Sequence, residues 1–594
     1  MKAKTYTFSM CLLLLTTVAC KSEVRTIDIA STNQRIELFY TSKLNTCIDL
    51  LDSISTSENT EKNISFYKKA RLHFKTIEPI LASIDKNNYK SLNAPNTLQV
   101  QEEDLTDIKI RNPFGFQVIE ELLYEPKIDT LKLQNTVSLT RNRLKLISEN
   151  TYINLKDYHI IWLLRNQITR IATTGITGFD SPVLCQSLLE SQYTYKTLIK
   201  LVDFFQDKFT SKKIYNNLRA SFKNAITILN HDFDSFDRYG FIKNHVDKQL
   251  KLLVKTQEDW NVIFPFEMAL SNNTSALFNP NTLNVFYFTD YKSDTTHLKH
   301  KELLGKELFN DKTLSKDNSM ACASCHIKDL AFTDGLKTFD SRQTRNSPTL
   351  TYSAYQQSYF MDGRTGSLEG QIVGVSKSHN EFNLIMDSIV NRVKKNPKYK
   401  FLLDSLYGSK RSNFNIRHAI ASYVRTLSPF NSKFDRNING KENTLTNIEK
   451  QGFNLFMGKA VCATCHFPPL FNGTVPPDFN DTELELIGVP EKNDTINAVV
   501  SNDPGRYNMI KTKERKHFFK TPTIRNIEKT APYMHNGVYN TLEEVLDFYN
   551  RGGGKGIGIH EKHQTLPFDN LNLSLEEQTH IIAFMKTLTD GNYK

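Results

Sequence analysis

The pentapeptide Cys-x-x-Cys-His occurs twice in this chain, as Cys322-Ala-Ser-Cys325-His326 and as Cys462-Ala-Thr-Cys465-His466. This pattern is the attachment signal of c-type haem: each cysteine forms a thioether to a haem vinyl group, and the histidine ligates the iron. A zinc site or a redox dithiol is the alternative interpretation, but both copies carry the histidine at the same place. The sequence therefore predicts two covalently bound c-type haems and electron-transfer chemistry.

The chain has 594 residues, too many for a single hydrophobic core, so several domains are expected. Residues 20–292 contain few glycines and carry apolar side chains every three or four positions, for example at Tyr67 and Phe74. This spacing predicts an all-α N-terminal domain over residues 20–292. The haem motifs predict a first cytochrome c-like domain over residues 293–440 and a second over residues 441–594. The predicted fold class is mainly α, a helical bundle followed by two haem domains.

The first residues of the chain have the pattern of an export signal. Lys2 and Lys4 precede an apolar stretch and then small residues, which predicts a secretory signal peptide over residues 1–19. The apolar stretch is too short to span a membrane. The residues before Cys20 resemble a bacterial lipoprotein processing site, which implies lipidation of Cys20 and attachment to a membrane; a soluble exported protein is the alternative. Both interpretations place the protein in the periplasm or cell envelope.

Cys47 and Cys185 belong to neither haem motif. In an oxidising compartment they form either a disulfide or two separate thiols, and both interpretations stay open. The formal net charge of +11 favours an acidic partner or an anionic surface. Because the sequence has no concentrated basic run, no nucleic-acid partner is expected.

The C-terminal half contains a series of motifs around the two haem sites. In chain order they are Leu304-Gly-Lys-Glu-Leu-Phe309, the first haem motif, Arg345-Asn-Ser-Pro-Thr349, Asp362-Gly-Arg364, the second haem motif, Thr521-Pro-Thr-Ile-Arg-Asn526 and Ala531-Pro-Tyr-Met-His-Asn-Gly537. In these motifs and their order, this half resembles the bacterial di-haem cytochrome c peroxidase and MauG superfamily. The resemblance implies a peroxidatic haem in the first haem domain and an electron-transferring haem in the second.

A shorter resemblance lies in the N-terminal region. Gly115-Phe-Gln-Val-Ile-Glu120 resembles a stretch of imelysin-like periplasmic helical proteins, with Gln117 in place of a histidine. Without that imidazole a metal site carried over by analogy loses its support, and a structural role for Glu120 is the favoured interpretation.

The resemblance implies that the protein reduces hydrogen peroxide, with electrons from a small donor protein, a cytochrome or a cupredoxin. The family's proton-transfer pair corresponds here to Gln371 and Glu381, ten residues apart, with Glu381 as acid and base and Gln371 orienting the peroxide. No histidine lies between His326 and His379. Unless His379 reaches the first iron, that haem is expected to be five-coordinate and active without prior reduction.

His466 is the predicted proximal ligand of the second haem, and the distal ligand has two candidates. The resemblance to MauG-type members implies Tyr549 as the distal ligand, whereas the peroxidases of the family use a methionine, here Met534. A phenolate favours ferric and higher oxidation states, so Tyr549 would give the second haem a low potential.

Two further positions come from the same resemblance. Met361 stands where the family commonly has a tryptophan that relays electrons between the haems. A calcium ion between the haem domains is implied at Asn346, Thr530 and Pro532, through one side chain and two backbone carbonyls.

Two other functions remain open. A MauG-like enzyme would use the same haems to oxidise a protein or an organic substrate, an interpretation that Tyr549 favours. An electron carrier or ligand-binding protein would show no peroxide chemistry at either iron.

Overall fold

The computed structural model describes residues 31–56, 59–102, 106–289, 295–340 and 343–593. The signal peptide predicted over residues 1–19 and the lipidation site predicted at Cys20 lie outside the described residues. Helices dominate this part of the chain, with two small two-stranded antiparallel sheets, which confirms the predicted mainly α class. None of the described helices is long and apolar enough to cross a membrane.

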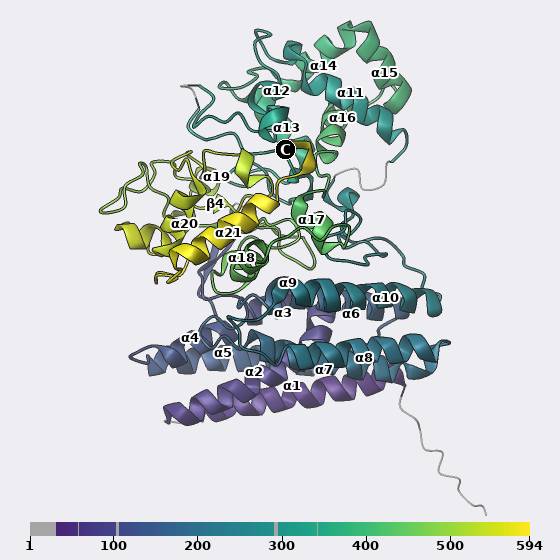
Figure 1. Ribbon diagram of the computed structural model, residues 1–594, viewed down its shortest axis with the longest axis vertical. Coiled ribbons are helices and arrows are strands. Elements are labelled where there is room, and N and C mark those ends of the chain that lie inside the picture. Colours follow the sequence, from purple (N-terminus) through teal and green to yellow (C-terminus); the bar gives the residue numbers. More distant parts are fainter. Residues whose placement is uncertain (1–30, 57–58, 103–105, 290–294, 341–342, 594) are drawn as a thin grey trace, which may run out of the picture.

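The N-terminal helices stack in layers at one end of the molecule (Figure 1). The helices are α1 Thr32–Thr56, α2 Thr60–Ile84, α3 Lys86–Leu92, α4 Phe116–Tyr124, α5 Thr130–Asn150, α6 Asp157–Arg170, α7 Ser187–Phe204, α8 Lys212–Ile228, α9 Arg238–Phe241 and α10 Asp247–Asp259. Strands β1 Gln99–Gln101 and β2 Lys109–Arg111 pair in an antiparallel sheet. Two π-helical turns interrupt the bundle, η1 Ile171–Gly175 and η3 Ile242–Val246.

Helix α2 shows how the sequence pattern builds the bundle. The side chain of Asn59 accepts a hydrogen bond from the backbone N–H of Lys62 and caps the helix start. The predicted apolar stripe is buried, with Tyr67 and Phe74 fully inaccessible to solvent. The helix continues through Pro79.

A buried polar network crosses the bundle. Arg71 pairs with Glu190 at 2.8 Å, and Lys75 pairs with Asp180 at 2.9 Å. Charges in a protein interior are tolerated only when they are paired, so this network fixes how α2 packs against α7. Glu120 is also buried, and its carboxylate accepts hydrogen bonds from the Tyr67 hydroxyl, the Ser181 hydroxyl and two backbone N–H groups. These bonds support a structural role for Glu120.

Cys47 and Cys185 are separate free thiols, so the structure favours the second of the two open interpretations. Cys47 is buried and donates to the carbonyl oxygen of Ala70, whereas Cys185 is exposed.

The two predicted haem domains, which together form the haem region from residue 295 to residue 593, lie above the bundle in Figure 1. The second haem domain lies between the bundle and the first haem domain. Its helices are α11 Leu298–Phe309, α12 Cys322–Cys325, α13 Leu368–Lys377, α14 Met386–Lys395, α15 Pro397–Tyr407, α16 Ser412–Arg425, α17 Lys433–Ile438, α18 Asn447–Met457, α19 Tyr507–Ile510, α20 Leu542–Asn550 and α21 Leu575–Thr587. Strands β3 Leu484–Glu485 and β4 Phe519–Lys520 form the second sheet.

Short 3₁₀ turns connect many of these elements. They are η2 Gln206–Lys208, η4 Val285–Phe288, η5 Lys312–Leu314, η6 Lys328–Leu330, η7 Ser353–Tyr355, η8 Cys462–Thr464, η9 Lys513–Arg515, η10 Ile527–Lys529, η11 Gly553–Ile557 and η12 Gly591–Tyr593.

Each haem domain is built on one pair of helices that approach closely at a glycine. In the first domain α11 crosses α16, and a Cβ atom on Gly305 would lie 1.8 Å from the carbonyl oxygen of Ala419. In the second domain α18 crosses α21, and a Cβ atom on Gly452 would lie 1.9 Å from the carbonyl oxygen of His580. Only glycine permits these two contacts.

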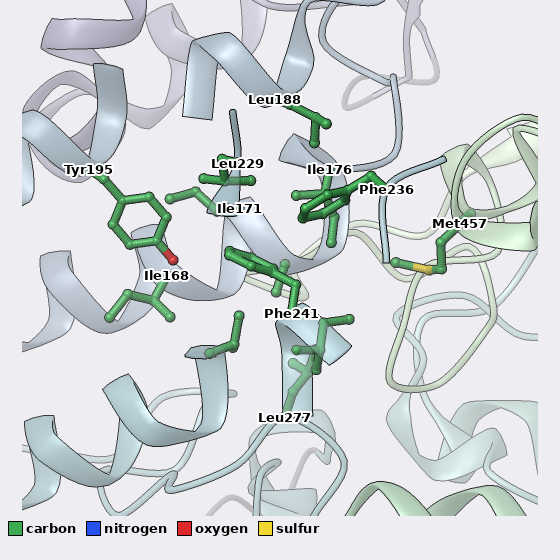
Figure 2. Packing of buried hydrophobic residues seen from close by; sticks show 14 of the residues in the cluster. Ile168, Ile171, Ile176, Leu188, Tyr195, Leu229, Phe236, Phe241, Leu277 and Met457 are labelled. Atoms are coloured by element: carbon green, nitrogen blue, oxygen red, sulfur yellow. The ribbon is translucent and has the colours of Figure 1, made fainter. Parts of the chain in front are cut away.

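The hydrophobic core of the bundle continues into the second haem domain. One cluster of buried side chains joins Ile176 and Phe241 of the bundle with Met457 of the second haem domain (Figure 2). Phe471 belongs to the same cluster. The first haem domain has its own cluster, around α11 and α16. The bundle and the second haem domain are therefore packed as one unit.

Candidate active site

A cavity of about 880 Å³ opens beside the first haem motif. Helix α12 carries Cys322 and Cys325, His326 follows it directly, and all three line the cavity. Its apolar walls come from α11, α16 and the turns between them, through Phe309, Leu314, Met320, Ile416, Ile420 and Val424. These walls, together with two thiols and one imidazole, fit a flat apolar macrocycle with an iron at its centre.

His326 is oriented by a backbone carbonyl. Its Nδ1 lies 3.0 Å from the carbonyl oxygen of Phe332, which leaves Nε2 free to act as an iron ligand. Burial lowers the pKa of His326, so the imidazole is held in the neutral form that binds metals. Burial also raises the pKa of Cys322 to about 12, which keeps this sulfur a neutral thiol before haem attachment.

Gln371 and Glu381, the predicted proton-transfer pair, line the same cavity as His326. Gln371 lies on α13, whose first turn is capped by the side chain of Ser367. Burial raises the pKa of Glu381, while the positive charge of Arg364 opposes that rise. A carboxyl group whose pKa is raised takes up a proton more readily than an exposed carboxyl group, which suits an acid and base.

His379, the alternative ligand considered for the first iron, is exposed and does not line the cavity. Among the described residues, His326 is the only histidine on the cavity wall.

Charged side chains form another part of the cavity wall. Arg345 donates to Asp503 at 2.5 and 2.9 Å and to Asp362 at 2.8 Å, and Arg364 donates to Asp362 at 2.8 Å. Arg345 and Asp362 belong to motifs quoted above, but nothing in the local sequence marks Asp503 as their partner.

Lys520 is another cation on the cavity wall, and the sequence did not reveal it. Its ammonium group donates to the Gln356 side chain at 2.6 Å on the cavity wall, and burial lowers the pKa of Lys520 to about 8. Its backbone N–H donates to the carbonyl of Met361 at 2.7 Å, which connects the cavity to strand β4. Together with Arg345, this cation suits the acidic edge groups of a haem.

The second haem motif lies on η8, where the imidazole is oriented in the same way. The Nδ1 atom of His466 lies 3.0 Å from the carbonyl oxygen of Pro522 and 3.3 Å from that of Phe471. Burial lowers the pKa of His466 to about 4, so this imidazole is also neutral. Both predicted proximal ligands therefore present a free Nε2 atom.

Tyr549 lies on α20 close to the second haem motif. Burial raises the pKa of its phenol, and the nearby sulfurs of Cys465 and Cys462 raise it further. A phenolate at this place therefore needs a positive counter-charge such as ferric iron. Met534, the alternative ligand, packs partly buried against the same hydrophobic cluster.

Two of the three predicted calcium ligands meet in the structure. The side-chain amide of Asn346 donates to the carbonyl oxygen of Pro532 at 2.7 Å, and Thr530 lies two residues before that proline. In the described part of the chain, no cluster of three or more His, Cys, Asp or Glu side chains could hold a metal ion.

Replacing both cysteines of the first haem motif by alanine should remove one of two haems. Without thioether bonds, the haem at His326 is held only by its iron ligand and packing. The intact mass of the exported variant should decrease by one haem, and the haem absorbance per chain should halve. Cys185→Ala, which changes an exposed thiol outside both motifs, should retain both haems. An unchanged mass in the double variant would contradict the assignment.

Comparisons relate this chain to known proteins. Residues 299–443 match the family described as di-haem cytochrome c peroxidase. The cytochrome-c peroxidase IdrP1 of Pseudomonas sp. (strain SCT) is 35% identical over 317 residues, which are 50% of this chain and 82% of that protein. The methylamine utilization protein MauG of Methylorubrum extorquens is 33% identical over 295 residues, 48% of this chain and 78% of that protein.

A solved MauG-like protein associated with microbial copper homeostasis is 27% identical and aligns with a TM-score of 0.43, over 50% of this chain and 93% of that one. The family match and the extent of the similarity to the curated relatives show that this chain belongs to the di-haem cytochrome c peroxidase family.

Proposed function

We propose that the protein reduces hydrogen peroxide in the cavity beside the first haem motif, with electrons that enter through the second haem domain. The observation that carries this proposal is one cavity lined by His326, Gln371 and Glu381. Members of this family bind two c-type haems, which supply the redox chemistry. The protein's own side chains bind the peroxide, orient it and move its protons.

Reduction of hydrogen peroxide to two waters consumes two electrons and two protons. Glu381 takes the proton from one peroxide oxygen and returns it to the other, and burial raises the pKa of this carboxyl group, which favours its uptake of a proton. The Gln371 amide donates a hydrogen bond that orients the peroxide. Since His379 is exposed and lies off the cavity wall, it would leave a distal position of the first iron open without prior reduction.

A MauG-like oxidation of a protein or organic substrate is the second candidate. The position of Tyr549 beside Cys462 and Cys465 favours it, because a phenolate ligand stabilises oxidised iron. In that case both haems share oxidising equivalents and withdraw electrons from the substrate.

Further features belong to this proposal. The side-chain oxygen of Asn346 and the carbonyls of Thr530 and Pro532 hold a calcium ion, a hard cation that prefers oxygen ligands. A small cytochrome or cupredoxin donates the electrons. The protein is exported to the periplasm or cell envelope and anchored to lipid at Cys20.

Glu381→Gln should slow peroxide turnover by about 10²- to 10⁴-fold, the usual contribution of a positioned acid and base, while both haems still load. Steady-state turnover with a reduced donor measures the loss, and intact mass measures haem content. Asp387→Asn, which removes an exposed carboxylate six residues along the chain, should change neither the turnover nor the haem content. Unchanged turnover in Glu381→Gln would remove this residue from the mechanism.

The pH profile of turnover gives an independent test of Glu381. Its ionised form accepts the peroxide proton, and burial raises its pKa, so turnover should fall as the pH drops through a value above the usual carboxyl range. In Glu381→Gln the residual rate should lack this acidic limb. If the acidic limb of the pH profile stays unchanged in Glu381→Gln, the titrating group is a residue other than Glu381.

Tyr549→Phe should change the optical and EPR spectra of the second ferric haem and raise its reduction potential, because an anionic ligand is lost. Met534→Leu should leave the spectra and the potential as they are. Tyr539→Phe, which alters a buried tyrosine packed against Phe548, is the matched control. The reverse result, a change in Met534→Leu alone, would identify the methionine as the ligand.

A further inference from the structure

Glu102, at the end of strand β1, connects the N-terminal region to the haem region. Its Oε2 accepts hydrogen bonds from Nη2 and Nε of Arg506 at 2.7 and 3.0 Å, and its Oε1 accepts from Nε of Arg515 at 2.7 Å. The exposed fractions of the three side chains are 15%, 14% and 17%. One carboxylate therefore neutralises two arginines that lie far from it in sequence, in a place where solvent screens them weakly.

Both arginines belong to the segment 503–517, which we call the rim segment. Asp503, Pro504, Asn508 and Met509 of this segment line the cavity, and the last two are exposed, so they lie at its mouth. The haem region itself holds one end of the segment, through Arg345 and Asp503.

Arg506 also connects the rim segment to the turn that carries Asp362 and Gly363. Its Nη1 donates to the carbonyl oxygens of Asp362 at 3.1 Å and Gly363 at 2.8 Å. Gly363 has a φ of 66°, a backbone conformation that glycine adopts without strain. A guanidinium fixed by Glu102 can hold the rim segment against this turn, because its planar donors have fixed directions.

Two other ion pairs join the bundle to the haem region. Lys86 pairs with Asp478, and Lys90 pairs with Asp481 at 2.8 Å. The side chains of Lys90 and Asp481 are each more than half exposed, so this ion pair contributes little to stability. The Glu102 contacts are more buried and act directly on the rim segment.

We propose that Glu102 is a positioning residue through which the N-terminal domain holds the rim segment closed over the cavity and restricts entry of molecules larger than peroxide. This inference rests on the proposed function only in taking the cavity as the place where peroxide reacts. It assigns the N-terminal domain a role in the selectivity of the haem site.

Hydrogen exchange of the full-length protein with both haems bound tests the contact directly. In Glu102→Gln, backbone amides of the rim segment should exchange at least about tenfold faster, because hydrogen bonds between charged groups are lost. Glu102→Asp should restore most of the protection. Asp107→Asn removes an exposed partner of Lys109 near the same sheet and should change nothing in the rim segment.

Arg515→Gln provides a second variant should Glu102→Gln fail to fold. Its effect on exchange should not add to that of Glu102→Gln in the double variant, because both changes break the same contact. Equal protection in wild type and both single variants would overturn the proposal, as would fully additive effects.

Ligand entry tests the role in selectivity. Association rates of cyanide and imidazole with the ferric protein are measured by stopped flow, because the two probes differ in size. Glu102→Gln should speed imidazole binding severalfold and leave cyanide binding within about twofold. Equal changes for both probes, or none, would overturn the restriction on entry. Absent peroxide turnover in the wild type would instead overturn the proposed function, and the hydrogen-exchange result would be unaffected.

Discussion

Each predicted haem site depends on one hydrogen bond, from the proximal imidazole to a backbone carbonyl. His326 is oriented by Phe332 and His466 by Pro522, in both cases at 3.0 Å through Nδ1. This bond fixes the tautomer and the ring plane, so that Nε2 faces the position of the iron. Burial keeps both rings neutral. The glycine-mediated helix crossings at Gly305 and elsewhere then support these segments.

The chemistry of the first site follows from where charge is buried. Glu381 keeps a raised pKa because it is withdrawn from water, yet Arg364 lies near enough to moderate it. Arg364 in turn is held by Asp362, which also binds Arg345. The carboxyl group proposed to transfer protons therefore lies beside a connected ionic network, and not in an isolated apolar pocket. Such a network fixes the geometry before peroxide arrives.

The site residues that the sequence predicted lie within or close to short continuous motifs. The haem cysteines, the proximal histidines and the pair Gln371 and Glu381 were all predicted, and the structure brings that pair into one cavity with His326. The mainly α class was also predicted and is confirmed. The burial of Lys520, by contrast, depends on side chains remote in sequence, and no local pattern marks it. The same holds for Asp503 and Glu102, whose arginine partners come from other segments.

The domain boundaries show a second limit of sequence pattern. Helical periodicity predicted the bundle, but it cannot show that the hydrophobic core continues into the second haem domain. Ring contacts such as Phe179 with Phe467, 6.2 Å apart, join segments that the sequence keeps far apart. Such contacts depend on the tertiary fold. They place the N-terminal domain against Phe467, which directly follows the second haem motif.

The proposed mechanism requires that the first iron would have an open coordination position served by Glu381. Optical and EPR spectra of the ferric two-haem protein, recorded before and after one equivalent of hydrogen peroxide without prior reduction, test it most directly. We predict one high-spin and one low-spin haem, and a prompt spectral change on addition of peroxide. Two low-spin haems that do not react with peroxide would contradict the account, because another ligand would then block the first iron.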